Sequence, residues 1–287
     1  MAVSETIWTW FEGSWHKGNP LVMRAADHGL WLGTPVFDGA RYFDGVAPDL
    51  DRHCDRVNHS ALALGMQPSM TVEEMVALTG EGLKNFAPGT AIYIRPMYWT
   101  TEGADASVIM ADETSTVFCL CLEALPLAPA DRSQTLTRTR FTRPTLASAL
   151  TNAKAACLYP NNARMLREAR DKRFTNALVT DSLGNVAETA TSNIFMVRDG
   201  VVRTPVPNGT FLNGITRQRV LALLREDGLE VQEATLGYQD FEEADEVFMT
   251  GNITKVTPVT AFDEVHYQHG PVAKRARELY WDWALSA

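Results

Sequence analysis

Residues 146–160 carry the sequence LASALTNAKAACLYP, and Lys154 is the single charged residue among them. Its uncharged, mostly small neighbours offer the amine little hydration, which favours the neutral, nucleophilic form. Lys255, in NITKVTPV, is the only rival among the six lysines. The other four lie among polar or charged residues, where solvated amines are the rule: Lys17, Lys84, Lys172 and Lys274. The stretch alone leaves open whether Lys154 is catalytic or structural.

Glu188 is the second unusual charge. It follows the turn residues Gly184 and Asn185 and precedes the uncharged stretch TATSNIFMV. An exposed acid at the end of a strand is one interpretation. The other is a carboxylate buried beside the cation of a bound cofactor, because a paired buried carboxylate avoids most of the cost of an unpaired one.

The third feature is GITR, residues 214–217, at the start of a predicted helix. The N–H groups of Ile215 and Thr216 would face the helix entrance, where the helix dipole favours a phosphate. Thr216 could equally act as an ordinary N-cap. A reactive lysine, a carboxylate for a pyridinium nitrogen and a phosphate-binding turn are the parts that a site for pyridoxal 5'-phosphate (PLP) requires.

With these three features, the chain resembles the class IV PLP enzymes over nearly its whole length. This fold family contains branched-chain aminotransferases, D-amino acid aminotransferases, (R)-selective amine transaminases and aminodeoxychorismate lyases. The resemblance implies an α/β (α+β) protein of fold type IV with two domains, the cofactor at the domain interface, and a homodimer. Lys154 then matches the Schiff-base lysine, which also moves a proton as acid and base.

The resemblance also implies the residues that bind the cofactor. Glu188 matches the acid on the pyridine nitrogen, and Tyr159 matches the tyrosine that bonds the phenolic oxygen. The remaining matches pack on the ring or hold the phosphate turn: Leu212, Ile215, Thr216, Asn252 and Arg56 in HCDRV. Without the resemblance, Arg56 could be a surface residue of a helix.

Two further stretches concern the substrate. TPVFDGARYF at 34–43 and YIRP at 93–96 resemble motifs of the branched-chain group. The substrate-binding residues implied are Phe37, Gly39, Arg41, Tyr93, Arg95 and Ile253. Tyr93 and Arg95 would serve the α-carboxylate, although an arginine on a strand can also pair with Asp or Glu. Leu32 stands where the branched-chain group usually has an aromatic residue. Asn252 lies in a turn where the aminodeoxychorismate lyases often have asparagine, so this turn resembles theirs.

We therefore expect an aminotransferase that moves an amino group from a branched-chain amino acid to a 2-oxo acid. An (R)-selective amine transaminase or a D-amino acid transaminase uses the same cofactor chemistry and stays open. So does an enzyme similar to the aminodeoxychorismate lyases. A binding or scaffold protein that kept the fold without the cofactor is the fourth alternative. The presence of both Lys154 and Glu188 in the chain argues against it.

Composition limits the partners and the compartment. The 287 residues include 45% hydrophobic residues, enough for a substantial core, and the net charge is −9. This charge argues against binding to nucleic acid or to an acidic membrane surface. The four cysteines and six histidines match no metal-binding pattern. The start of the chain lacks the pattern of a signal peptide, and no stretch is long and apolar enough to span a membrane. We expect no metal and a cytoplasmic protein.

The chain also shows where its domains divide. LPLAPADRSQT, with Pro126 and Pro129, is the best linker candidate. We predict a smaller α+β domain at 1–125, a linker at 126–137 and a larger cofactor-binding domain at 138–287. Helices are expected at 50–64, 72–86, 161–173 and 214–228, with a closing helix at 272–284. Short strands between 177 and 206 predict an antiparallel meander.

Overall fold

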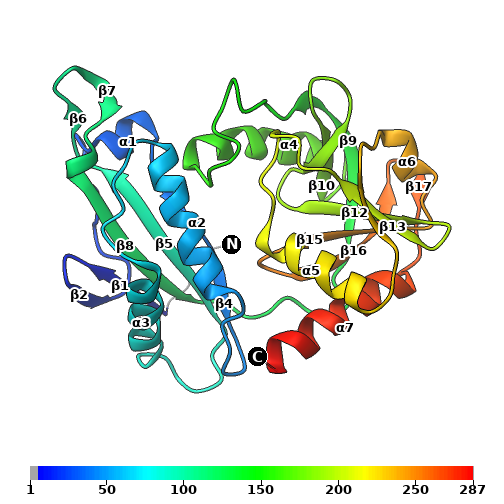
Figure 1. Cartoon of the computed structure of the whole chain (residues 1–287), viewed down its shortest axis with the longest axis horizontal. Helices are drawn as coiled ribbons and strands as arrows, with labels where there is room; N and C mark the ends of the chain where they lie inside the picture. The colour runs from blue at the N-terminus through cyan, green and yellow to red at the C-terminus, as the bar shows by residue number, and fades with distance from the viewer. Residues whose placement is uncertain (1–5, 287) are drawn as a thin grey trace. The chain divides into compact units, whose positions relative to one another are not determined.

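The chain forms two compact units, shown in the computed structural model of Figure 1. The structure describes residues 6–286; residues 1–5, at the start of the predicted first domain, and Ala287 lie outside this range. Unit 1 comprises the described residues up to Leu127 together with Asn152–Cys157, and unit 2 comprises Ala128–Thr151 and the chain from Leu158 onward. The segment that carries Lys154 therefore belongs to unit 1, although it lies within the sequence range predicted for the second domain.

Backbone pairing explains why this segment joins unit 1. Val36 and Ala155 form an antiparallel β-bridge. The Phe37 N–H donates to the carbonyl of Lys154 at 3.1 Å, and the Ala156 N–H donates to the carbonyl of Pro35 at 2.8 Å. The segment is thus hydrogen-bonded to the motif TPVFDGARYF.

Unit 1 is built on an antiparallel sheet of six strands in the order β2-β1-β8-β5-β3, with β4 also paired to β5. Its strands are β1 (Ile7–Phe11), β2 (Ser14–Lys17), β3 (Val36–Phe37), β4 (Ala40–Tyr42), β5 (Ile92–Thr100) and β8 (Thr116–Ala124). A separate hairpin joins β6 (Gly103–Ala104) to β7 (Ser107–Ala111). The helices are α1 (His28–Leu32), α2 (Leu50–Ala63), α3 (Val72–Leu83) and the 3-10 turn η1 (Glu113–Ser115).

Side chains on β5 alternate between the two faces of this sheet. Ile92, Ile94 and Tyr98 are buried on the face that α2 and α3 cover. Tyr93 and Arg95 point to the opposite face and are only half-buried. The sheet of unit 1 therefore has an apolar face toward its helices and a polar face that carries the YIRP motif.

Unit 2 contains a mixed sheet of nine strands in the order β11-β10-β9-β16-β15-β12-β13-β14, with β17 beside β16. The strands are β9 (Gln134–Thr142), β10 (Asn176–Thr180), β11 (Val186–Thr189), β12 (Asn193–Arg198), β13 (Val201–Pro205), β14 (Val231–Ala234), β15 (Glu246–Gly251), β16 (Lys255–Phe262) and β17 (Val265–His266). The helices are α4 (Tyr159–Asp171), α5 (Ile215–Glu226), α6 (Tyr238–Glu242) and α7 (Pro271–Ser286), while the 3-10 turn η2 (Ala156–Leu158) begins in unit 1 and ends at the residue where unit 2 resumes.

The predicted antiparallel meander is wrong. Strands β10–β11 and β12–β13 do form antiparallel hairpins. The two hairpins are not neighbours, however, because β9, β16 and β15 lie between them, and β9 runs parallel to both β10 and β16. Such long-range pairs leave no local mark in the sequence. The predicted mixed α/β class is confirmed.

Both faces of the unit 2 sheet are covered. Leu178 and Met249 belong to a core cluster that includes Phe241 of α6. Ala177 and Val179, on the other face, pack with Met165 and Ala169 of α4. Helices α5 and α7 pack against each other, α5 contacts β15, and α7 contacts β15 and β16.

Helix α5 differs from its prediction at one end. Its N-cap is Gly214 and Thr216 lies inside the first turn, so the prediction of Thr216 as N-cap is wrong. At the other end, Gly228 has φ of 88°, which suits a glycine just beyond a helix. None of the helices within residues 6–286 combines the length and the apolar character that a membrane crossing needs.

Candidate active site

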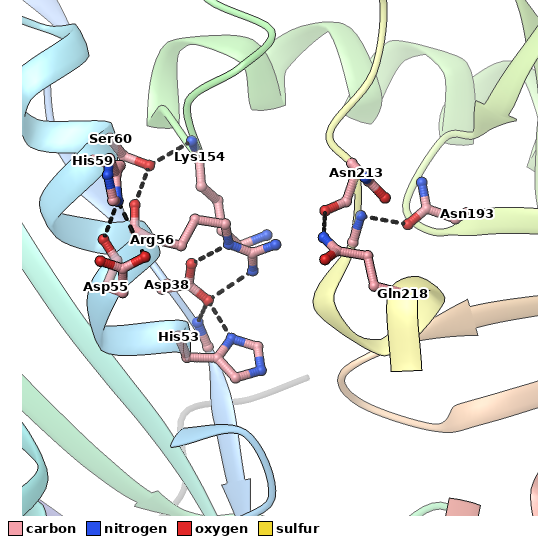
Figure 2. A network of polar contacts seen from close by, with 12 residues as sticks. Asp38, His53, Asp55, Arg56, His59, Ser60, Lys154, Asn193, Asn213 and Gln218 are labelled. Atoms are coloured by element: carbon pink, nitrogen blue, oxygen red, sulfur yellow. Dashed lines mark hydrogen bonds and ion pairs between the residues drawn. The ribbon is translucent and has the colours of Figure 1, made fainter. Parts of the chain in front are cut away.

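In unit 1, Lys154 is fixed through its backbone. Its N–H donates to Ser60 Oγ of α2 at 3.0 Å, and its carbonyl accepts the N–H of Phe37. The bond to Ser60 is drawn in Figure 2, and the Lys154 Nζ lies 5.2 Å from the centroid of the Phe37 ring. Lys154 is half-buried, whereas its rival Lys255 is 1% exposed.

Arg56, one helical turn before Ser60, is held by a completely buried carboxylate. Asp38 Oδ2 accepts from Arg56 Nε at 2.6 Å, and Asp38 Oδ1 accepts from Nη2 at 2.8 Å and lies 2.6 Å from His53 Nδ1. Burial alone would raise the pKa of Asp38, but the charges and hydrogen bonds of Arg56 and His53 hold it well below its ordinary value. Arg56 is therefore a largely buried, oriented cation and not an ordinary surface residue of the helix.

The predicted substrate residues of unit 1 share the polar face of its sheet. Phe37 pairs with Met97, and Arg41 pairs with Tyr93, so their side chains point the same way as those of Tyr93 and Arg95. Gly39 makes room for this arrangement, because a Cβ there would lie 2.3 Å from the Tyr93 hydroxyl.

Two arginines on this face differ in their surroundings. Arg95 Nη2 lies 3.4 Å from Glu123 Oε2. Arg95 therefore has the carboxylate partner that the sequence allowed as an alternative to substrate binding. Arg41 is completely buried and donates from Nη2 to the carbonyl of Leu125. Its Nε and Nη1 have no hydrogen-bond partner within residues 6–286, and burial lowers its pKa to about 10. Arg41 is thus a buried cation with unused donors.

In unit 2, Glu188 is held from two sides. Arg143 Nη2 lies 3.2 Å from Oε1, and Asn193 Nδ2 donates to Oε2 at 3.2 Å. The Glu188 side chain is only 13% exposed. The interpretation of Glu188 as an exposed acid at a strand end is therefore wrong, because the carboxylate is largely buried and paired with Arg143.

The start of α5 adjoins this acid. Asn193 Nδ2 also donates to the carbonyl of Leu212 at 3.0 Å, and its Oδ1 accepts the N–H of Gly214 at 3.1 Å. Across the described residues, no side chain caps the N-terminus of α5, and its first turn carries no acidic residue. The N–H groups of this first turn therefore suit an anion.

Three other predicted residues lie on unit 2. Tyr159 is the first residue of α4 and is exposed. Asn252 and Ile253 form the turn after β15, where Asn252 Oδ1 accepts from Lys255 Nζ at 2.8 Å. The Nδ2 of Asn252 is buried and has no partner within the range that the structure describes.

Sequence reasoning missed the residues that support these groups. Asp38 stands inside the quoted motif VFDGARYF, and His53 precedes Arg56 by three positions on one helical face, so both could have been suspected. Arg143 and Asn193 carry no local signal. Nowhere within residues 6–286 do three His, Cys, Asp or Glu side chains gather as a metal site would require.

Comparisons with known proteins agree with this geometry. A family model described as amino-transferase class IV matches residues 35–262. The chain belongs to the class IV aminotransferases. It is 60% identical to an aminotransferase from Brucella abortus whose crystal structure contains PLP, with a TM-score of 0.96 over 98% of this chain and 99% of that one.

Other relatives of this class IV aminotransferase carry names of the branched-chain group. It is 30% identical to the branched-chain-amino-acid aminotransferase of Pseudomonas aeruginosa, over 95% of this chain and 91% of that protein. It is 25% identical to the branched-chain aminotransferase of Thermoproteus uzoniensis, solved with norvaline, with a TM-score of 0.89 over 98% of this chain and 95% of that one.

Each unit by itself carries groups that suit PLP, the cofactor of class IV aminotransferases. Unit 1 supplies a half-buried lysine and an arginine held in place by Asp38. Unit 2 supplies a cation-paired carboxylate and a helix N-terminus without a side-chain cap in the described chain. A pyridine ring that carries a phosphate requires groups of these kinds. This enzyme is a PLP-dependent transaminase.

Proposed function

We propose that this transaminase moves the amino group of a branched-chain amino acid, such as leucine, to a 2-oxo acid. Relatives named for the branched-chain group support this substrate class, as do the motifs VFDGARYF and YIRP. PLP, when bound, supplies an electron-withdrawing ring that stabilises negative charge at the substrate Cα. The residues of the chain must hold that ring, place the substrate and move one proton.

In unit 1, Lys154 would carry the cofactor and then move the proton between the substrate Cα and the C4′ carbon of the cofactor. Its backbone bonds to Ser60 and Phe37 fix where the side chain begins, while the half-buried amine keeps freedom to move. Arg56 would bind the phosphate, and the Asp38 carboxylate orients its guanidinium for that task.

In unit 2, Glu188 would pair with the ring nitrogen and keep it protonated. Arg143 and Asn193 already favour the ionised carboxylate, as this role requires. The N–H groups of Ile215 and Thr216 would bind the phosphate together with Asn252. Leu212 would pack on the ring, and the Tyr159 hydroxyl would bond the phenolic oxygen.

The substrate would lie against the polar face of the unit 1 sheet. Tyr93 and Arg95 would hold its α-carboxylate, and Phe37 and Gly39 would shape the wall beside the reacting carbon. Arg41 adds a positive charge to the same face. Ile253 would offer its backbone N–H, which does not depend on its side chain.

One observation carries this proposal: Glu188 and the start of α5 are joined in one hydrogen-bonded cluster. The test compares the parent with Glu188→Gln, using L-leucine and 2-oxoglutarate. The variant should keep PLP, seen by its absorbance, and lose turnover by about a thousandfold, or roughly 4 kcal/mol of barrier. Near-normal turnover in the variant would contradict the role of Glu188.

A homodimer in the cytoplasm completes the proposal. Exposed apolar side chains gather on β7, namely Val108, Ile109 and Met110, and the carbonyl of Ile109 lies 3.2 Å from His28 Nε2 of α1, which exposes Trp31. Exposed apolar side chains of this kind suit a protein interface. Ile109→Asp should shift the sedimentation coefficient toward the monomer. Four cysteine thiols are compatible with a reducing compartment.

A further inference from the structure

We propose that Asn193 is a positioning residue that keeps Glu188 and the first turn of α5 in one fixed arrangement. This inference rests on the proposed roles of Glu188 at the ring nitrogen and of α5 at the phosphate. These two groups must lie at a constant separation, because the ring and its phosphate form one small, stiff molecule. A single side chain that bonds to both supports can set that separation.

The contacts of Asn193 span the cluster. Its Nδ2 donates both to Glu188 Oε2 at 3.2 Å and to the carbonyl of Leu212 at 3.0 Å. Its Oδ1 accepts the N–H of Gly214 at 3.1 Å (Figure 2). The side chain amide has two N–H donors and one carbonyl oxygen, and this orientation is the one that satisfies a carboxylate, a carbonyl and an N–H together. An amide therefore fits this position better than a hydroxyl or a carboxylate.

The support itself is rigid. Asn193 is 5% exposed and begins β12, where it pairs with Thr250 of β15 inside the large sheet. The chain of α5 comes close to it only because residue 214 is glycine: a Cβ there would lie 2.2 Å from Asn193 Oδ1. The start of the helix is thus brought against an amide that the sheet holds in place.

The bond to Glu188 also has an electrostatic effect. An N–H that donates to a carboxylate stabilises its ionised form. Asn193 at Oε2 and Arg143 at Oε1 therefore both favour the ionised carboxylate of Glu188. An aspartate at this position would keep an acceptor for the Gly214 N–H. It would also place a second carboxylate beside Glu188, which raises the pKa of the pair.

The experiment measures the dissociation constant of PLP, the unfolding midpoint of the apoprotein and the pH profile of kcat for the parent, Asn193→Ala and Asn193→Asp. Asn176→Ala is the matched control: Asn176 is 3% exposed on β10 and donates to Thr191 Oγ1, with no hydrogen bond to Glu188 or α5 among those of the described chain. Asn193→Ala should weaken PLP binding at least about tenfold more than Asn176→Ala does. Asn193→Asp should bind PLP more tightly than Asn193→Ala and should move the acid limb of kcat to higher pH.

Two results would overturn the inference. One is a PLP dissociation constant for Asn193→Ala that equals that of Asn176→Ala. The other is an unmoved acid limb in Asn193→Asp, which also decides the matter if Asn193→Ala does not fold. A parent that binds PLP but transaminates no branched-chain amino acid would contradict the proposed substrate, while the PLP titration would still test Asn193.

Discussion

Asp38 accepts two hydrogen bonds from Arg56, from Nε at 2.6 Å and from Nη2 at 2.8 Å, although its carboxylate is completely closed to solvent. The fork of the guanidinium matches the two carboxylate oxygens, so Arg56 is held in one orientation. An arginine that must bind a phosphate gains from such support, because less side-chain freedom remains to be lost on binding.

Asp38→Asn should lower the free energy of unfolding by roughly 3 kcal/mol at neutral pH, because Arg56 and His53 lose their anion. Asp38 has a depressed pKa in the folded protein, so its contribution is present above its unfolded pKa of about 4 and is lost as pH falls below that value. Denaturant titrations from pH 7 to pH 3 should give a shallower acid decline for the variant. Parallel declines would contradict the pairing.

Arg56→Ala should weaken PLP binding by tenfold or more and leave kcat at saturating PLP much less affected. Arg56→Lys should fall between the parent and the alanine variant, since lysine keeps the charge but cannot pair in a fork with Asp38. Equilibrium titration of the apoproteins with PLP measures both. An unchanged dissociation constant in Arg56→Ala would remove Arg56 from the phosphate site.

Gly39→Ala should impair the handling of the amino acid. A Cβ at this position would lie 2.3 Å from the Tyr93 hydroxyl, which must then move by about 1 Å, and a shift of this size can cost about a hundredfold in rate. Gly80→Ala on α3 is the control, because nothing lies within 4 Å of its new Cβ; it should raise stability by about 1 kcal/mol. Equal kcat/KM for L-leucine in both variants would argue against the role of Tyr93.

Arg41→Met should weaken substrate binding without lowering the stability of the fold. Arg41 is buried with no carboxylate paired to it in residues 6–286, so a well-packed apolar side chain should leave stability unchanged or raise it by about 1 kcal/mol. The KM for L-leucine should rise, because the substrate face loses a cation. Arg217→Met is the contrast: Arg217 is equally buried but lies 2.7 Å from Glu233, so its loss should destabilise the fold. A destabilised Arg41→Met with normal KM would make Arg41 structural.

Local sequence predicted the elements well where their causes are local. The apolar spacing of α2 and the glycine after α5 placed those helices within a few residues. The order of the unit 2 strands could not be predicted, since β9 and β16 pair although more than a hundred residues separate them in the sequence. The same holds for the residues 152–157, which leave their predicted domain to pair with β3.

The residues of the candidate site also differ in how far the sequence alone could predict them. Lys154 and Glu188 were conspicuous because each is a lone charge in an uncharged stretch. Asp38 could be suspected from its motif but Asn193 could not, and the partners Arg56 and Gly214 lie 18 and 21 positions away, where only the fold brings them close. Lys255 stood out only as the rival of Lys154, and the sequence could not show that β16 buries it, with its Nζ 5.3 Å from the centroid of the Tyr280 ring.

The substrate class is tested most directly by the ratio of kcat/KM for L-leucine to that for (R)-1-phenylethylamine, with 2-oxoglutarate as the common acceptor. A face that offers Tyr93, Arg95 and Arg41 to a carboxylate is left with unsatisfied donors when the carboxylate is missing. The parent should prefer leucine by about a hundredfold or more, and Arg95→Ala should reduce that preference. A parent that prefers the amine, or a ratio unmoved in Arg95→Ala, would contradict the branched-chain assignment.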